Sequence, residues 1–290
     1  MFRINKMTRG RFGNKVLQYN SLMQIASLMD ERAFCTHWEE GSAIFDLPPL
    51  STEDVMRKQE KLLTWRECVG PCLDNIKTMY NTYDLVLDDP AYMLHNVFFQ
   101  ITHQDPRKFL PITNNYKRNL PPEIKNVGIH FRGTDILGAD GNHGREIHRP
   151  EYYINSIDFI ESEFPNTKYY ICTDDLNFES YNTTIRYLEN KKCLFEKGNV
   201  NDYLTDFATL AACDILIASS STFVVCAGFL GKSNKRIIHS KEWIDKNISH
   251  FPWHYKEDSK DIRQMQLTFD DFWIRLYNGG NEFYNIWRLI

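Results

Sequence analysis

The chain has 290 residues, of which 42% are hydrophobic and 25% are charged, and its net charge is −4. This composition is that of an ordinary globular protein, and it excludes the disordered, collagen-like and low-complexity classes. The small negative charge gives no general attraction to nucleic acid or to an anionic membrane surface. At roughly 150 residues per domain, the length predicts two domains.

No apolar run approaches the roughly 20 residues of a transmembrane helix, and the basic amino-terminal stretch lacks the apolar core of a signal peptide. Seven cysteines are scattered without a C-x-x-C pair, which favours reduced thiols over a disulfide framework or a zinc site. We therefore expect a cytoplasmic protein with no transmembrane segment and no nucleic-acid partner.

The first half of the chain gives a mixed pattern. Apolar residues at spacings of three and four predict a helix over about 15–29. Ser51 and Asp54 form a loose N-cap signal, which predicts a helix from there to about residue 66. We also expect a short strand over 84–88 and a helix over 91–101. The prolines within 104–126 predict an irregular link between two halves, with domains at 1–120 and 121–290.

After this link, predicted strands and helices alternate regularly. The strands are expected at 127–131, 168–172, 193–195, 214–218 and 236–239, the last of them ending the set. The helices are expected at 150–164, 177–189, 202–213 and 222–230. Such alternation indicates a parallel, doubly wound sheet. Sheets of this kind bind ligands beyond the carboxyl ends of their strands.

The segment His130 to Asp135 (HFRGTD) follows the first strand of this half, where such a sheet opens to ligand. Strand alternation places His130 and Arg132 on one face and Phe131 on the other. The planar fork of arginine matches phosphate oxygens, and Gly133 lets the backbone turn closely around a ligand. The alternative is a strand-end arginine that pairs with Asp135 at the surface.

Residues 218–223 (ASSSTF) join the strand over 214–218 to an apolar helix. Their hydroxyl groups can cap the free backbone N–H groups at the start of that helix. The same N–H groups, together with the helix dipole, can bind phosphate. The sequence leaves both interpretations open.

Two further segments are candidates for ligand contact. Gly10, Arg11, Gly13 and Asn14 form a glycine-rich turn that opens the first helix, although they match neither G-x-G-x-x-G nor a Walker loop. A Thr-Asp-Asp run that contains Asp174 ends the second strand of the regular half, either as a helix cap or as a ligand acceptor.

Several kinds of chemistry have no signature in this chain. No Asp-x-Asp pair occurs, so the metal–diphosphate clamp of many nucleotide-sugar enzymes has no candidate. No H-E-x-x-H, G-x-S-x-G or kinase signature is present, and the nine histidines show no metal-ligand spacing. We therefore expect no metal site and no cofactor.

Four motifs, taken together, resemble those of the fucosyltransferase superfamily of α-1,2-, α-1,6- and protein O-fucosyltransferases. The amino-terminal G-R-x-G-N motif is matched by GRFGNKVLQY (10–19), and the shared H-x-R-x-x-D peptide by HFRGTD. The strand that ends in T-D-D is matched by YYICTDD (169–175), and the third peptide with its Ser-rich turn by DFATLAACDILIASSSTF (206–223). The motifs occur in the order of the family.

The resemblance implies the GT-B architecture, an α/β fold of two Rossmann-like domains whose parallel sheets face each other across a cleft. The amino-terminal domain would serve the acceptor, and the carboxyl-terminal domain would bind the nucleotide sugar. It implies an inverting, metal-independent glycosyltransferase that moves L-fucose from GDP-fucose to an oligosaccharide or glycoprotein glycan. The alternatives are the same fold with another donor such as UDP-xylose, and a non-catalytic protein that binds a sugar or nucleotide.

Carried over to this sequence, the resemblance assigns Arg132 to the diphosphate and places His130 beside the nucleotide. Asp206 would accept hydrogen bonds from the guanine edge, because a carboxylate matches its adjacent N–H donors. The other donor-binding residues would be Gly10, Arg11, Gly13, Asn14, Asp174, Ser220, Ser221 and Thr222. The catalytic candidates are Arg132, which would stabilise the leaving group, and three possible general bases, Asp135, His143 and Glu146.

Two positions depart from the family pattern. Gly133 stands where a second arginine is common, which leaves less positive charge at the leaving group. Lys15 stands where glutamine is usual.

Overall fold

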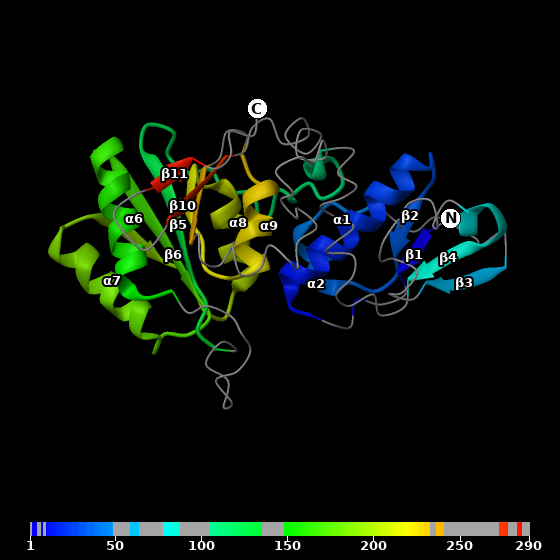
Figure 1. Cartoon of the computed structure of the whole chain (residues 1–290), viewed down its shortest axis with the longest axis horizontal. Helices are drawn as coiled ribbons and strands as arrows, with labels where there is room; N and C mark the ends of the chain where they lie inside the picture. The colour runs from blue at the N-terminus through cyan, green and yellow to red at the C-terminus, as the bar shows by residue number, and fades with distance from the viewer. Residues whose placement is uncertain are drawn as a thin grey trace. The chain divides into compact units, whose positions relative to one another are not determined.

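The structure is a computed structural model, and it describes residues 2–4, 7, 10–48, 59–63, 78–87, 105–134, 148–232, 236–240, 273–277 and 283–285. Of these, the residues up to Thr113 form one compact unit and those from Asn114 onward form a second. The division falls inside the stretch 104–126. Figure 1 shows the two units, each of which has its own sheet and helices.

The first unit is a small α/β unit. Its elements are β1 (Phe2–Ile4), α1 (Phe12–Leu28), β2 (Ala33–Cys35), α2 (Glu39–Ile44), β3 (Glu60–Leu63), β4 (Asp84–Leu87) and the 3-10 helix η1 (Pro106–Lys108). The sheet has the order β2-β1-β4-β3, and every neighbouring pair in it is parallel.

Aromatic side chains hold α1 in place. Phe12 and Tyr19 lie on the same face of this helix and contact Trp38, with ring centroids 6.1 and 5.4 Å apart. Trp38 in turn contacts Phe45 at 5.8 Å. The helix predicted over 15–29 is confirmed, and it begins three residues earlier because the glycine-rich turn continues directly into it.

The other predictions for this unit have mixed outcomes. The helix predicted over 51–66 is wrong for residues 60–63, which form β3 and pair with β4. A loose N-cap signal is local, whereas pairing with a distant strand decided this conformation. The strand predicted over 84–88 is confirmed as β4, and β2 and α2 were not predicted. The helix predicted over 91–101 lies outside the described residues.

The second unit contains a larger sheet. Its strands are β5 (Lys125–Phe131), β6 (Thr167–Thr173), β7 (Leu194–Lys197), β8 (Ile215–Ile217), β9 (Arg236–Ser240), β10 (Trp273–Tyr277) and β11 (Phe283–Asn285). They have the order β11-β10-β9-β8-β5-β6-β7, and all pairs are parallel except β10 with β11. Its helices are α6 (Pro150–Glu163), α7 (Glu179–Asn190), α8 (Tyr203–Ala212) and α9 (Thr222–Phe229).

The strands and helices predicted between 127 and 230 are confirmed, with small differences at their ends. The strand predicted over 236–239 is also confirmed, but it does not end the set, because β10 and β11 extend the sheet beyond it. None of the helices in the described part of the chain has the length and apolar composition needed to cross a membrane.

Strand order reverses next to β5. The chain runs outward from β5 through β6 to β7, then returns to β8 on the other side of β5 and continues to β9 and β10. The carboxyl ends of β5 and β8 therefore form a topological switch point. Open α/β sheets bind their ligands at such points.

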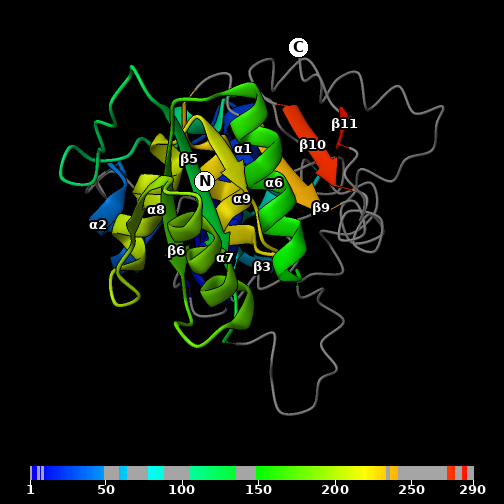
Figure 2. The ribbon, with the colours of Figure 1, turned by 90° about the vertical axis from the view of Figure 1, so that its left-hand side faces the viewer.

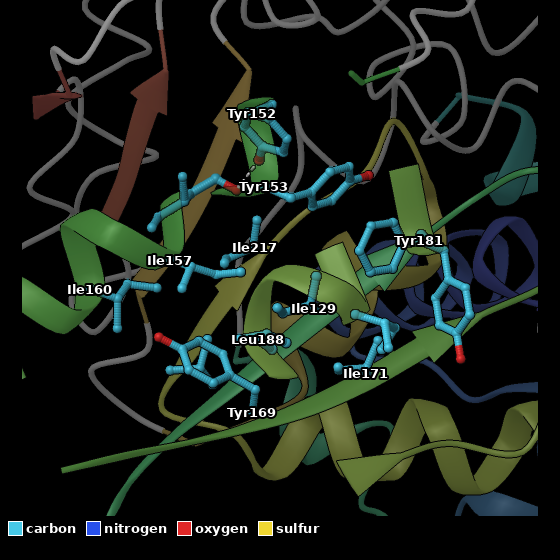
Figure 3. Packing of buried hydrophobic residues seen from close by; sticks show 14 of the residues in the cluster. Ile129, Tyr152, Tyr153, Ile157, Ile160, Tyr169, Ile171, Tyr181, Leu188 and Ile217 are labelled. Atoms are coloured by element: carbon cyan, nitrogen blue, oxygen red, sulfur yellow. Dashed lines mark hydrogen bonds between the residues drawn. The ribbon is translucent and has the colours of Figure 1, made fainter. Parts of the chain in front are cut away.

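The two faces of this sheet have different neighbours. Odd-numbered residues of the central strands, among them Ile129, Ile171 and Ile217, form a buried core with α6 and α7 (Figure 3). On the opposite face, Gly128 lies against Leu210 of α8. Figures 1 and 2 show α6 and α7 on one side of the sheet and α8 and α9 on the other. Because both faces of the sheet are covered, β5 is buried at every residue after Lys125.

Candidate functional site

Two segments that the sequence singled out meet at the switch point. β5 leads into Arg132, and β8 leads into the turn Ser219–Ser221, which we call the three-serine turn. Arg132 Nη1 donates a hydrogen bond to Ser221 Oγ at 3.0 Å, and His130 Nδ1 lies 2.6 Å from Ser219 Oγ. Phe131 belongs to the core on the other face, as strand alternation predicts.

These groups are buried. Arg132 is 9% exposed, His130 is 7% exposed, and the three serines are buried as well. Burial lowers the pKa of His130 to about 4, while the charge of Asp174 acts to raise it and that of Arg132 to lower it further. His130 is therefore neutral at neutral pH, and Arg132 carries the positive charge at this point of the sheet.

The three-serine turn also starts α9. Ser221 is the N-cap residue, and its hydroxyl oxygen accepts a hydrogen bond from the Phe223 N–H at 3.3 Å. The Phe223 ring stacks on His130, with centroids 5.2 Å apart, and Thr222 is the first helical residue. The turn therefore caps the helix and also sets the positive end of the helix dipole beside Arg132. Such an arrangement favours an anionic ligand.

Asp174, at the end of β6, holds the turn that follows β5. Its Oδ1 accepts hydrogen bonds from the N–H groups of Gly133 and Thr134 at 2.6 and 3.4 Å, and its Oδ2 accepts one from the Thr134 hydroxyl at 2.8 Å. Burial acts to raise the pKa of Asp174, but these hydrogen bonds and His130 hold it below its usual value. Asp174 thus fixes the backbone next to Arg132, and a direct contact with a donor stays a prediction.

A steric reason explains the glycine at position 133. A Cβ atom there would lie 2.8 Å from the Asp175 Cβ, 2.9 Å from its Oδ2 and 3.2 Å from the Phe178 Cβ. The second arginine of the family pattern therefore has no room in this loop.

Asp206 lies in the first turn of α8. Its carboxylate lies against the backbone of Gly198 and accepts a hydrogen bond from the Asn199 N–H. Burial raises its pKa to about 6, although the hydrogen bond from Asn199 acts to lower it. The neighbouring Phe207 packs edge-on against Phe223 at 5.3 Å, which connects α8 to the start of α9. A contact of Asp206 with a base stays a prediction.

The glycine-rich turn belongs to the first unit. Gly10 has a φ of 82°, which favours glycine, and Arg11 is the N-cap residue of α1. The carbonyl oxygen of Arg11 accepts a hydrogen bond from the Asn14 N–H at 2.9 Å. Lys15, which stands where glutamine is usual, forms an ion pair with Glu40 of α2. The donor contacts predicted for this turn, including those of Gly13, remain predictions.

The three candidates for the general base, Asp135, His143 and Glu146, lie outside the described residues, so their roles stay predictions. Within the described ranges, no group of three or more His, Cys, Asp or Glu side chains is arranged to hold a metal ion.

The structure adds His148, which sequence reasoning missed. Its Nε2 lies 3.3 Å from Ser220 Oγ, and its carbonyl oxygen accepts a hydrogen bond from Ser180 Oγ at 2.8 Å. Its ring lies 4.5 Å from that of Tyr152, and the residue is 5% exposed. Its partner Ser220 is 72 residues away in the chain. No local pattern reports such a contact, and the only signal is a histidine just before a helix.

Comparison with protein-family models and with curated protein sequences finds no match. Among solved structures, POFUT1 in complex with GDP-fucose matches with a TM-score of 0.51 and 11% identity, over 79% of this chain and 93% of that chain. An Arabidopsis thaliana FUT1 mutant in complex with GDP matches with a TM-score of 0.49 and 13% identity, over 79% of this chain and 68% of that chain. The first likeness shows that this chain has the fold of a fucosyltransferase, and the predicted GT-B fold is confirmed.

Proposed function

We propose that this protein is a glycosyltransferase that transfers L-fucose from GDP-fucose to a hydroxyl group of a glycan, with inversion and without a metal ion. The observation that carries the proposal is the hydrogen bond of buried Arg132 to Ser221, the N-cap residue of α9, at the switch point of the sheet. The proposal is supported by the fold shared with POFUT1, which was solved with GDP-fucose.

The chemistry follows from what sugar transfer requires. The bond between the anomeric carbon and a phosphate oxygen breaks, and negative charge develops on the leaving diphosphate. Arg132 and the first N–H groups of α9 would stabilise that charge, and their burial strengthens the interaction. The acceptor hydroxyl attacks the opposite side of the anomeric carbon and gives its proton to a general base, for which Asp135, His143 and Glu146 are the candidates.

The choice of nucleotide rests on Asp206. Guanine presents two adjacent N–H donors, which an ionised carboxylate accepts well, whereas uracil presents one N–H between two carbonyl groups. With its pKa at about 6, Asp206 is ionised at neutral pH. We therefore propose that Asp206 selects GDP over UDP.

A nucleotide panel followed by a transfer assay tests the proposal. GDP, UDP, CDP and ADP are compared by thermal shift, since a ligand at 100 times its dissociation constant stabilises a protein by about 2.7 kcal/mol. Stabilisation by GDP and release of GDP from GDP-fucose with a glycan acceptor are the expected results. Preference for UDP would replace the donor with a UDP-xylose type. Binding of GDP without turnover across an acceptor library would favour a non-catalytic binding protein.

A further inference from the structure

Each residue of the three-serine turn has a basic partner. His130 is paired with Ser219, His148 with Ser220 and Arg132 with Ser221, at 2.6, 3.3 and 3.0 Å. The basic residues come from the end of β5 and from the segment before α6. The proposed function assigns a role to Arg132 and leaves His148 without one.

A diphosphate bound at this turn would bring more negative charge than Arg132 alone balances. Arg132 and the carboxylate of Asp174 have opposite charges, and His130 is neutral when the site is empty. A nucleotide sugar brings a negative charge on each phosphate. Burying these charges without compensation is costly, so a group that can gain a positive charge on binding would be favourable.

We propose that His148 is a further donor-binding residue, which takes up a proton from solvent when the diphosphate binds and acts on it through the hydroxyl of Ser220. This inference rests on the proposed function. A protonated His148 would be the second cation of the site, in place of the second arginine that the family pattern has at position 133.

The geometry provides the path. A protonated His148 would donate its Nε2–H to Ser220 Oγ, so that Ser220 could donate its own hydroxyl proton to a phosphate oxygen. The neighbouring residue Ser221 already has this arrangement. Its Oγ accepts hydrogen bonds from Arg132 and from the Phe223 N–H. Its own hydroxyl proton can therefore be donated to a ligand.

The surroundings of the two histidines differ. His130 faces Arg132, which opposes a second positive charge, as well as Asp174, and Cys172 is its partner on β6. The contacts of His148 include the rings of Tyr152 and Tyr153 on α6, Ser180 on α7 and Ser220. Arg149, the next residue, is exposed. Burial opposes a positive charge on both histidines, and Arg132 adds to this opposition at His130, so we assign the proton uptake to His148.

Calorimetric titration of GDP-fucose tests this proposal. The diphosphate of GDP-fucose does not titrate near neutral pH, whereas the terminal phosphate of GDP has a pKa of about 6. Titration at about pH 7 in two buffers of different ionisation enthalpy gives the number of protons taken up. We expect uptake of up to about one proton, and binding that tightens by up to about tenfold per pH unit as the pH falls.

Two variants and one spectroscopic measurement assign the proton. His148→Gln should still bind GDP-fucose but lose the proton uptake, while His37→Gln, which changes an exposed histidine of the first unit, should leave it unchanged. The histidine NMR signal that is missing in His148→Gln should titrate at higher pH once GDP-fucose is added to wild type.

The outcomes separate the two proposals. If wild type binds GDP-fucose without proton uptake, or if His148→Gln retains the uptake, the role of His148 is overturned and the proposed function stands. If folded wild type does not bind GDP-fucose, the proposed function is overturned, and this inference with it. If His148→Gln does not fold, the wild-type proton uptake and histidine titration decide.

Discussion

The immediate neighbours of Arg132 fix the position of its guanidinium group. Its guanidinium is buried and bonded to Ser221, so it is held in one position before a ligand arrives. A pre-organised cation needs little rearrangement when negative charge develops, which is why such groups contribute strongly to catalysis. Single substitutions at this position are correspondingly informative.

Arg132→Ala should lower turnover at least about 10²-fold, in the range seen when one donor to a developing anion is lost. Arg132→Lys should not restore it, because an ammonium group does not replace a planar fork. The measurement is release of GDP from GDP-fucose under saturating donor. Arg186→Ala, which changes an exposed arginine on α7, is the control and should keep full activity. Near-normal turnover in folded Arg132→Ala protein would contradict the assignment.

Asp206→Asn should remove most of the preference for GDP over UDP, a loss of roughly 1–3 kcal/mol for one unpaired hydrogen-bonding group. In wild type, that preference should shrink as the pH falls through about 6, because the carboxyl group then becomes protonated. Calorimetric titration of GDP and UDP at about pH 7.5 and about pH 5.5 measures the difference in their binding free energies. The contribution of the diphosphate cancels in this difference because both nucleotides carry one. A preference that is unchanged in Asp206→Asn would mean that another group recognises the base.

At the scale of elements, the site is assembled from the carboxyl ends of three neighbouring strands. β5 supplies Arg132, β8 supplies the three-serine turn, and β6 supplies Asp174, which holds the turn that follows Arg132. Because parallel strands end at the same edge of a sheet, residues far apart in the chain meet here. Asp174, at the end of β6, therefore determines the position of the turn after β5 as much as the sequence of that turn does.

Asp174→Ala should cost about 1–3 kcal/mol of stability, because the buried N–H of Gly133 loses its acceptor. It should also lower kcat more than it changes the KM for donor, if Asp174 acts by positioning Arg132. Asp174→Asn keeps an acceptor oxygen and should restore part of both. Chemical denaturation and steady-state kinetics provide the two readouts. A variant that is unstable but has normal kcat would show a purely structural role.

At the scale of the whole molecule, His130 couples stability to pH. Its pKa is about 4 in the folded protein and near 6.5 in the unfolded chain, so the unfolded chain binds more protons between these values. Stability is then complete above about pH 6.5 and decreases as the pH falls toward 4. Asp206, with its raised pKa, acts in the opposite direction between its usual value and about 6.

Denaturation midpoints at about pH 7 and about pH 5 should reveal this coupling. His130→Gln should lose less stability between the two pH values than wild type does, because glutamine does not titrate. His37→Gln should behave like wild type, since that histidine is exposed. An equal loss in His130→Gln and wild type would assign the acid sensitivity to other groups.

Activity should survive removal of divalent cations. The chain has no Asp-x-Asp pair to hold a metal–diphosphate complex, and Arg132 with the start of α9 is proposed to stabilise the leaving group instead. The measurement is turnover before and after EDTA treatment. Loss of activity that Mn²⁺ or Mg²⁺ restores would overturn the metal-independent mechanism.

The sequence allowed prediction of the second unit better than the first. Between 127 and 230, apolar strands and amphipathic helices alternate, so local periodicity and final structure agree. In the first unit, β3 has no strand pattern of its own and depends on pairing with β4. The Arg132 and three-serine segments could be found because each follows a strand, but the pairing of His148 with Ser220 depends on tertiary contact alone.

The crowding at Gly133 restricts the order in which this site can change during evolution. An arginine introduced here would meet the Asp175 side chain at its Cβ, and a rigid backbone-proximal atom cannot move aside as a flexible chain end can. The substitution is therefore expected to be deleterious in the present background, and relief of the contact with the Asp175 Cβ requires glycine at position 175, since every other residue keeps that atom. Two lineages with the same fold that hold one or two arginines in this loop would thus be separated by an epistatic barrier rather than by selection for different ligands.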